Sequence, residues 1–392
     1  MSSSPLIKRA AMVLRQVTER RPADQVLREV VTSHREWSAV EKRGLARVVF
    51  AYFRWLGWVD RSESMQRQVE QALEVQTRFD RDPASIKVEA LAARAVPAWL
   101  RDELDLGPEL LRHLQRDPAL WLRPRTGRHR DVSLALGDCE EVRVERRDNR
   151  FAFLESGAAP HCPPTAHGVW PDDCHLGLLR YGGLNDLFFS APFREGLFEI
   201  QDIASQVVGR FCAPQAGETW WDACAGEGGK LLHLSDLMGG KGLIWASDRS
   251  ERRLEVLKRR ASRAEVFNYR CAPWDGGVNL PTRTKFDGVL VDAPCSGVGT
   301  WRRNPHARWT TSPRDVAELA AVQKSLLRNA ADSLKPGGRL VYAVCTLTRS
   351  ETSAVADAFS AERADFDPVL RATVWPQDLD GNGMYLAAWR RR

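Results

Sequence analysis

The sequence contains little cysteine, little lysine and no long apolar run. Its eight cysteines are scattered through 392 residues without the spacing of a disulfide framework, so we expect reduced thiols. No stretch approaches the roughly 20 apolar residues of a membrane-spanning helix. The first nine residues lack the apolar run of a secretory signal. These absences exclude disulfide-rich secreted proteins and helical membrane proteins, and we expect a soluble, cytoplasmic protein with no membrane partner.

The basic residues are nearly all arginine. The net charge is +6, and nine of the 57 basic residues are lysine while 48 are arginine. The planar guanidinium group pairs bidentately with phosphate and stacks on bases, so this excess suits nucleic-acid binding. A biased genomic base composition would produce the same excess, and composition alone leaves both explanations open. Hydrophobic residues at 43% and charged residues at 28% exclude a largely disordered or fibrous chain.

The hydrophobic pattern predicts three parts. Residues 1–115 carry apolar residues at helical spacing and form an all-helical domain. Residues 116–195 change to short alternating runs with many glycines and prolines, which indicates a small α/β connecting region. In residues 196–392, short apolar strands alternate with amphipathic helices, so we predict an α/β domain with a Rossmann-like, doubly wound parallel sheet. The expected strands lie at 219–221, 243–246, 288–291 and 340–344, and the expected helices at 250–263 and 315–334.

Acidic residues follow three successive strands of this domain. Glycines after a strand let the backbone approach a ligand closely, and a carboxylate at a strand end can bind ribose hydroxyls. We interpret this pattern as an adenosine cofactor site of the methyltransferase type. The alternative is that each aspartate merely caps the next helix. The residues of the predicted site are Cys224, Ala225, Gly226, Glu227, Gly228, Gly229 and Lys230 in the turn after Asp222, then Asp248 and Asp275 after the next two strands.

Two cysteines follow neighbouring core strands. Asp292 ends one strand and Cys295 follows it, while Cys345 follows the next core strand fifty residues later. A thiol in a strand-end loop can be partly exposed and activated by nearby arginine. One buried cysteine would usually be packing, but two beside an acidic cofactor site predict thiol chemistry in one cleft. Just beyond Cys295, three arginines are predicted to grip nucleic-acid phosphates, with a solvated loop as the alternative: Arg302, Arg303 and Arg308.

The segment Asp-Ala-Pro-Cys-Ser-Gly at 292–297, together with the second cysteine, resembles the RNA cytosine-5 methyltransferases of the RsmB/Sun and NSUN type. The resemblance runs from about Phe193 to the C-terminus and includes Lys-Pro-Gly-Gly at 335–338. More weakly, residues 1 to about 110 resemble the NusB-like RNA-binding domain of bacterial members, best at 46–55.

The resemblance implies that Cys224 to Lys230, Asp248, Asp275 and Asp292 hold S-adenosyl-L-methionine. It also implies that Cys345 is the nucleophile, that Cys295 assists release, and that Asp292 supports the addition. The expected reaction is methyl transfer to C5 of cytosine in RNA, with ribosomal RNA favoured and transfer RNA second. No obligate protein partner is evident.

Some positions depart from the family pattern. Glu227 replaces proline in the cofactor loop and adds a negative charge near the expected cofactor carboxylate, unless its side chain points outward. After Cys345, the usual Pro-Glu-Glu-Asn becomes Arg-Ser-Glu-Thr at 349–352, which leaves the support of that loop open. The usual Arg-Val-Asn element is at best Arg-Pro-Arg at 123–125.

Two alternatives to this function follow. The departures favour a non-catalytic RNA-binding or ribosome-assembly factor on the same fold, whereas the retained cysteines and aspartates argue against it. DNA methylation is disfavoured, because the DNA enzymes use the Pro-Cys thiol as nucleophile and need no second cysteine.

A cluster of zinc-ligand residue types lies in the connecting region. It lacks the paired spacing of zinc sites, so we expect a loop-rich connector and no metal. Its members are His161, Cys162, His167, Cys174 and His175.

Overall fold

The structure is a computed structural model that describes residues 4–147, 150–153 and 178–392. The chain forms two compact units. The helical unit combines Met1–Pro118 with Leu184–Asp186 and Gly297–Pro313, and the sheet unit comprises Ala119–Gly183, Leu187–Ser296 and Arg314–Arg392. This division differs from the three predicted parts, because the strands of the connecting region pack with the C-terminal half.

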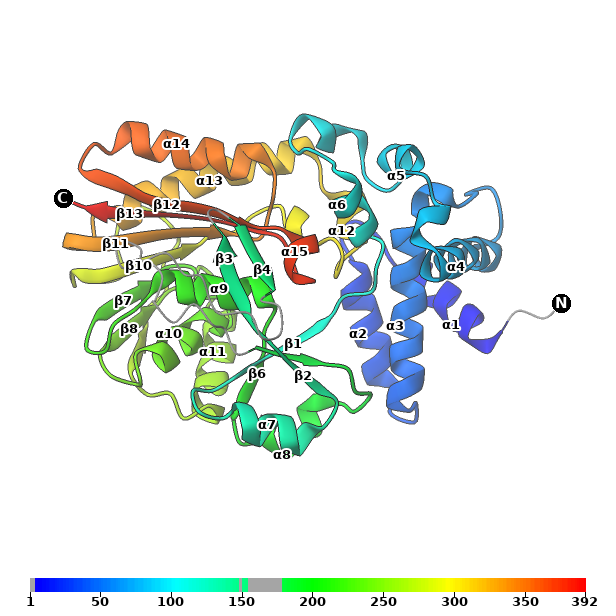
Figure 1. Ribbon diagram of the computed structural model, residues 1–392, viewed down its shortest axis with the longest axis horizontal. Coiled ribbons are helices and arrows are strands. Elements are labelled where there is room, and N and C mark those ends of the chain that lie inside the picture. Colours follow the sequence, from blue (N-terminus) through cyan, green and yellow to red (C-terminus); the bar gives the residue numbers. More distant parts are fainter. Residues whose placement is uncertain (1–3, 148–149, 154–177) are drawn as a thin grey trace. The chain divides into compact units, whose positions relative to one another are not determined.

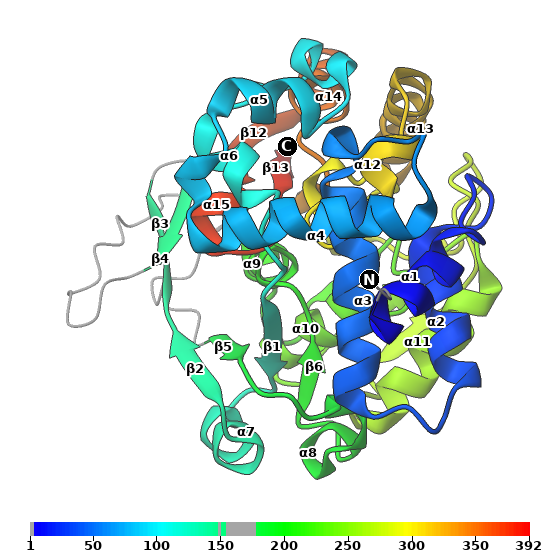
Figure 2. The ribbon, with the colours of Figure 1, turned by 90° about the vertical axis from the view of Figure 1, so that its right-hand side faces the viewer.

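The helical unit confirms the helices expected in the first part of the chain. Helix α3 packs against both α1 and α4, and Figure 2 shows α4 crossing it. It begins with a capping box, in which Ser38 and Glu41 satisfy each other's backbone N–H groups. The NusB-like character of this unit stays a prediction. Its elements are α1 (Pro5–Leu14), α2 (Ala23–Ser33), α3 (Ala39–Arg54), η1 (Leu56–Trp58), α4 (Met65–Arg81), η2 (Pro83–Ser85), α5 (Val88–Arg94), η3 (Ala98–Asp102) and α6 (Pro108–His113).

A segment from the C-terminal half completes the core of the helical unit. Gly297–Pro313 contains η5 (Val298–Thr300) and α12 (Ala307–Thr310). The indole N–H of Trp309 donates to the carbonyl of Phe53 at 2.6 Å. The guanidinium of Arg308 is fully buried and donates to the carbonyls of residues 95 and 114 at 2.8 and 3.0 Å. The segment therefore folds with helices that lie some 200 positions earlier in the sequence.

The sheet unit is built on a seven-stranded sheet with strand order β12-β13-β11-β10-β7-β8-β9. The five strands from β11 to β9 are parallel, whereas β13 is antiparallel to β11 and β12 is antiparallel to β13. The four predicted strands are confirmed as β7, β8, β10 and β11. The strand bounds are β7 (Thr219–Asp222), β8 (Leu243–Ala246), β9 (Tyr269–Cys271), β10 (Phe286–Asp292), β11 (Leu334–Val344), β12 (Phe366–Val374) and β13 (Met384–Arg391).

Helices cover both faces of this sheet, as Figure 1 shows. Leu290 of β10 packs in a core with α9 (Ile203–Cys212), α10 (Gly229–Leu237) and α11 (Glu251–Arg263). Its neighbours Val289 and Val291 pack on the other face, with α13 (Pro313–Ala331) and α14 (Ser353–Glu362). Successive side chains of a strand point to opposite faces, so the continuous apolar run at 289–291 serves two cores. Helices α11 and α13 confirm the two predicted helices, and the predicted doubly wound fold is correct.

The remaining strands form a four-stranded antiparallel sheet, ordered β2-β5-β1-β6, and a hairpin of β3 and β4. The indole of Trp121 in β1 donates to the carbonyl of Asp380, which ties this region to the C-terminal half. These elements are β1 (Leu120–Pro124), α7 (His129–Leu136), β2 (Cys139–Val142), β3 (Val144–Arg147), β4 (Arg150–Phe153), β5 (Leu178–Tyr181), η4 (Leu187–Phe189), α8 (Ala191–Arg194), β6 (Phe198–Ile200), η6 (Arg349–Glu351) and α15 (Pro376–Leu379). Within the described residues, no helix is both long and apolar enough to cross a membrane.

We expect Arg308→Ala to destabilise the protein by about 2–4 kcal/mol, because two buried carbonyls lose their donors. The matched control is Arg303→Ala. Because the side chain of Arg303 is exposed, this variant should change the free energy of unfolding by no more than about 0.5 kcal/mol. Urea unfolding followed by tryptophan fluorescence measures both. An Arg308→Ala midpoint equal to that of the control would show that the segment is not held as described.

Candidate active site

The two predicted thiols lie together at the carboxyl ends of the central strands. Strands β10 and β11 are parallel, with Asp292 paired to Ala343 in register. Each strand is followed within three residues by a cysteine, and the Sγ atoms of Cys295 and Cys345 are 3.3 Å apart. Both thiols are partly exposed, and none of the six cysteines in the described ranges forms a disulfide. The structure thus brings both cysteines to one place.

A lysine joins this pair to the glycine-rich turn. The ammonium group of Lys230, in the first turn of α10, contacts the carboxylate of Asp292 at 2.6 Å. Burial acts to lower the pKa of Lys230, but the charge of Asp292 and the hydrogen bond to it outweigh burial, so the pKa is raised. Cys345 also interacts electrostatically with Lys230. The site therefore holds a charged ammonium beside a carboxylate and a thiol.

The glycine-rich turn wraps around Asp248. The backbone N–H groups of Gly226 and Ser250 donate to the two oxygens of Asp248, at 3.0 and 2.8 Å. Each carboxylate oxygen has about two lone-pair sites, so each can still accept a ligand hydroxyl. Gly228 has a φ of +85°, and a Cβ there would lie 2.6 Å from Leu257. Only glycine fits at that position without strain.

The other predicted residues of the turn have distinct environments. The N–H of Ala225 donates to the carbonyl of Ser247, which fastens the turn to the end of β8. Burial raises the pKa of Cys224, so its thiol stays protonated. The side chain of Glu227 is exposed, which meets the condition under which its charge does not oppose a cofactor carboxylate.

A cavity of about 340 Å³ lies beyond β8 and β9, at the same edge of the sheet. Asp275 lines it, and one oxygen of this carboxylate accepts the N–H of Gly277 at 2.8 Å. Arg249, which directly follows Asp248 in the sequence, also lines the cavity. With Asp248 beside it, the cavity has the size and polar groups that suit a nucleoside. The complete lining is Arg249, Pro273, Trp274, Asp275 and Asn279.

A buried glutamate outside the predicted site residues supports both thiol loops. The side chain of Glu351 is fully buried. It accepts the N–H of Ser296, next to Cys295, and the hydroxyl of Thr346, next to Cys345. A signal was present in the sequence, because Glu351 is the one residue of the 349–352 segment that keeps the Pro-Glu-Glu-Asn pattern.

The three predicted phosphate-binding arginines have different environments. Arg302 and Arg308 are buried, and their guanidinium groups bind His113 and backbone carbonyls inside the helical unit. The prediction that both contact phosphates is therefore wrong, because a buried, hydrogen-bonded guanidinium is not available to a ligand. Arg303 is exposed and stays a candidate.

The zinc-type cluster at 161–175 lies outside the described residues. Within the described ranges, no group of three or more histidine, cysteine, aspartate or glutamate side chains is arranged to hold a metal ion.

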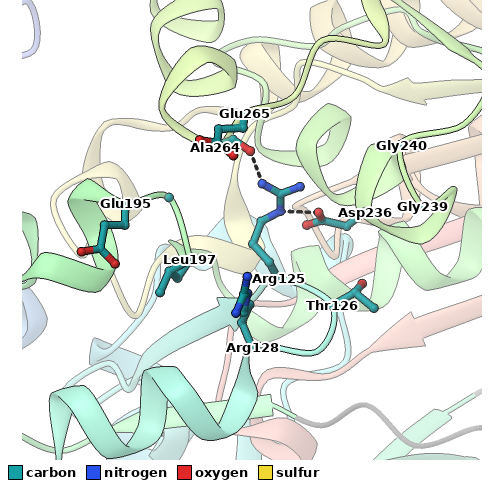
Figure 3. A pocket seen from close by; sticks show the side chains of 11 residues that line it. Arg125, Thr126, Arg128, Glu195, Leu197, Asp236, Gly239, Gly240, Ala264 and Glu265 are labelled. Carbon is teal, nitrogen blue, oxygen red and sulfur yellow. Dashed lines mark hydrogen bonds and ion pairs between the residues drawn. The ribbon is translucent and has the colours of Figure 1, made fainter.

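A second pocket of the sheet unit, about 310 Å³, lies away from the thiols. Figure 3 shows Arg125 at its centre, donating to the carboxylate of Asp236 and to the carbonyl of Ala264. Its lining includes residues just after the C-terminal ends of α10 and α11, where the chain returns to begin β8 and β9, together with residues from the segments 125–128 and 195–197. It therefore lies at the opposite edge of the sheet. Arg123 also binds Asp236, so the Arg-Pro-Arg element joins β1 to α10.

The chain is similar in sequence to known rRNA methyltransferases. Residues 210–390 match a family model described as 16S rRNA methyltransferase RsmB/F. The probable ribosomal RNA small subunit methyltransferase B of Bacillus subtilis (strain 168) is 40% identical over 180 residues, covering 45% of this chain and 40% of that protein. Ribosomal RNA small subunit methyltransferase B of Klebsiella pneumoniae (strain 342) is 31% identical over 319 residues, covering 76% and 66%. The chain thus spans between 40% and 66% of these relatives' lengths.

Solved structures show the same fold at low identity. The crystal structure of PH0851 covers 100% of both chains with a TM-score of 0.73 and 21% identity. NSun6 from Pyrococcus horikoshii, solved with SFG, has a TM-score of 0.55 and 20% identity over 72% of this chain and 93% of that chain.

The buried Asp222 at the end of β7 gives a test of the site's electrostatics. Burial, with the charge of Asp292 adding to it, raises the pKa of Asp222 to about 8. In an unfolded chain the pKa of aspartate is about 3.9. At a pH between these two pKa values, Asp222 is therefore protonated in the native state and ionised in the unfolded state. Stability should therefore fall as the pH rises from about 4 to about 8 and change no further above that range.

We expect Asp222→Asn, which cannot ionise, to lose this dependence. The melting temperature of the wild type, relative to the variant, should fall between about pH 5 and about pH 8. Parallel melting profiles for the two proteins would contradict the assignment of a neutral Asp222.

Proposed function

Because residues 210–390 belong to the RsmB/F family of 16S rRNA methyltransferases, we propose that this protein methylates C5 of a cytosine in RNA with S-adenosylmethionine as donor. The observation that carries the proposal is the pair of thiols, Cys295 and Cys345, 3.3 Å apart beside Asp292. Ribosomal RNA is the preferred substrate, because the named relatives act on the small ribosomal subunit RNA, and transfer RNA is second.

The residues at the strand ends fit S-adenosylmethionine. Asp248 would bind the ribose hydroxyls, because each of its oxygens keeps accepting capacity and it lies beside the 340 Å³ cavity. Asp275 and Arg249 would line the space for the base. The backbone of the turn from Cys224 to Lys230 would approach the methionine part closely, since its glycines leave room. When bound, S-adenosylmethionine supplies an electrophilic methyl group.

Cys345 is the proposed nucleophile. Its thiolate adds to C6 of the cytosine, which makes C5 electron-rich and able to take the methyl group. The nearby ammonium of Lys230 favours the thiolate form of a thiol. Asp292, partnered by Lys230, accepts a hydrogen bond from the exocyclic amino group of the base, next to N3, and supports the addition. In this scheme the methyl group reaches C5 only while the bond between Cys345 and C6 exists.

Cys295 is the proposed base for release. After methyl transfer, C5 carries one proton too many, and its removal lets the C6–sulfur bond break and the ring double bond form again. C5 and C6 are bonded neighbours, so a base for C5 must lie next to the nucleophile for C6. A separation of 3.3 Å between the two sulfur atoms fits that requirement.

The substrate cytosine must leave its stack to reach these thiols, which costs a few kcal/mol and least in single-stranded RNA loops. Arg303, exposed eight residues beyond Cys295, is the proposed phosphate contact. Two observations weigh against the non-catalytic alternative: Glu227 is exposed, and the buried Glu351 hydrogen-bonds the loop after Cys345. The methyltransferase must bind S-adenosylmethionine and use both thiols, whereas the non-catalytic factor needs neither.

The two cysteine variants should fail in different ways. Cys345→Ala should abolish formation of 5-methylcytidine, because no adduct forms. Cys295→Ala should instead accumulate a covalent protein–RNA adduct, because release is blocked. The measurement is transfer of labelled methyl from S-adenosylmethionine to unmodified rRNA and tRNA, with nucleoside analysis and a denaturing gel. Continued synthesis of 5-methylcytidine by Cys345→Ala would refute the proposed nucleophile.

Cofactor binding tests the non-catalytic alternative directly. The wild type should bind S-adenosylmethionine in calorimetry, and Asp248→Asn should bind it about 10- to 100-fold more weakly, since hydrogen bonds to a charged group are lost. Glu255→Gln is the control, because Glu255 is exposed on α11 and pairs with Lys258. Absence of binding by the wild type would favour the non-catalytic factor.

A further inference from the structure

One buried carboxylate is hydrogen-bonded to the loops that carry both thiols. Glu351 is fully buried at the end of η6. Its Oε1 accepts the N–H of Ser296 at 2.8 Å, and its Oε2 accepts the hydroxyls of Ser296 and of Thr348, the latter at 2.8 Å. The hydroxyl of Thr346 also donates to Oε2, at 3.2 Å. The residues directly after Cys295 and after Cys345 therefore share one acceptor.

A second buried residue extends this network to the other side of Cys295. The amide nitrogen of Gln323 on α13 donates to Glu351 at 3.0 Å and to the carbonyl of Pro294 at 2.9 Å. The hydroxyl of Tyr342 donates to Gln323 at 2.9 Å and to the carbonyl of Glu351 at 2.6 Å. Both neighbours of Cys295 are thus fastened to β11 and α13 through two side chains.

The chemistry of the network requires a carboxylate at this position. Every side-chain and backbone group that contacts the Glu351 oxygens is a donor, and a carboxylate offers only acceptor sites, about four in number. A glutamine would turn its NH₂ group toward hydroxyls that need an acceptor. Burying a charge is unfavourable unless hydrogen bonds compensate it, and a fully satisfied buried network makes its surroundings rigid.

We propose that Glu351 is a positioning residue, which holds Cys295 and Cys345 at the spacing that lets one thiol act on C5 and the other on C6 of the same base. The catalytic consequence rests on the function proposed above, whereas the spacing of the thiols does not. Without Glu351, both thiols remain, but the loops that carry them lose their shared acceptor and keep the direct contact between the hydroxyls of Ser296 and Thr346, at 3.0 Å.

The spacing can be measured without any catalysis. In the full chain, glutathione disulfide accepts two electrons and two protons from the thiols, forming a Cys295–Cys345 disulfide and two molecules of glutathione. The equilibrium constant of this reaction increases when the folded chain holds the two sulfur atoms close together. Alkylation of the remaining thiols and peptide mass mapping identify the bridge among the eight cysteines.

We expect half of the Glu351→Gln protein to form the disulfide only at a ratio of glutathione disulfide to squared glutathione about 10- to 100-fold higher than for the wild type. Small misplacements of reacting groups have effects of this size. Ser296→Ala removes one donor to Glu351 and the hydroxyl contact with Thr346, but keeps the backbone N–H that Glu351 accepts, and should shift the constant less. The matched control is Glu362→Gln. Glu362 is exposed at the end of α14 and pairs with Arg328, so its variant should stay within about twofold of the wild type.

Circular dichroism and S-adenosylmethionine binding show whether each variant is folded. If Glu351→Gln does not fold, Ser296→Ala carries the test. A folded Glu351→Gln, or Ser296→Ala in its place, with the wild-type disulfide constant would overturn the proposal.

The methylation assay separates this inference from the proposed function. If the function is correct, Glu351→Gln should lower kcat about 10- to 100-fold with an unchanged KM for S-adenosylmethionine, and the covalent RNA adduct should accumulate as in Cys295→Ala. A wild type that methylates no RNA, but whose disulfide constant depends on Glu351, would refute the function and support the positioning role. A wild type that methylates RNA, but whose disulfide constant is unchanged by Glu351→Gln, would support the function and refute the positioning role.

Discussion

Strands β10 and β11 lie side by side in the middle of the seven-stranded sheet, parallel and with Asp292 opposite Ala343. Their hydrogen bonds determine which residues leave the sheet together, and so bring Cys295 and Cys345 within 3.3 Å although fifty residues separate them. A slip of one residue in this register would turn every following side chain to the other face of the sheet. The core prevents such a slip, because Val289 and Val291 pack under α13 while Leu290 packs under α9 and α10.

The sheet and its thiols could be predicted from the sequence because their signals are local. Buried parallel strands appear as continuous apolar runs, and the residues that end them, such as Asp248 and Cys345, follow directly. The polar network could not be predicted in the same way. Glu351 depends on donors from three separate segments, and only the folded chain shows that these donors converge on one side chain.

Dependence on distant segments also explains why the burial of Arg302 and Arg308 could not be predicted from the sequence. In the sequence, a stretch of arginine, asparagine and proline resembles a solvated loop, because its burial depends on carbonyl groups at residues 95 and 114. Part of the arginine content serves the core of the protein itself. Arginine can be buried when carbonyls or carboxylates meet its five donors. The buried arginines of the described ranges are Arg54, Arg123, Arg302, Arg308 and Arg339.

The membership of Gly297–Pro313 in the helical unit has a consequence for the order in which the protein is made. The helices up to Pro118 leave the ribosome without the segment that supplies Trp301 and Arg308 to their core. Roughly 180 residues must be added before it arrives, which at about 5–20 residues per second takes on the order of 10–40 s. During that time the early helices have an incomplete core. The helical unit, although it lies first in the chain, finishes folding only after most strands of the seven-stranded sheet have been synthesised.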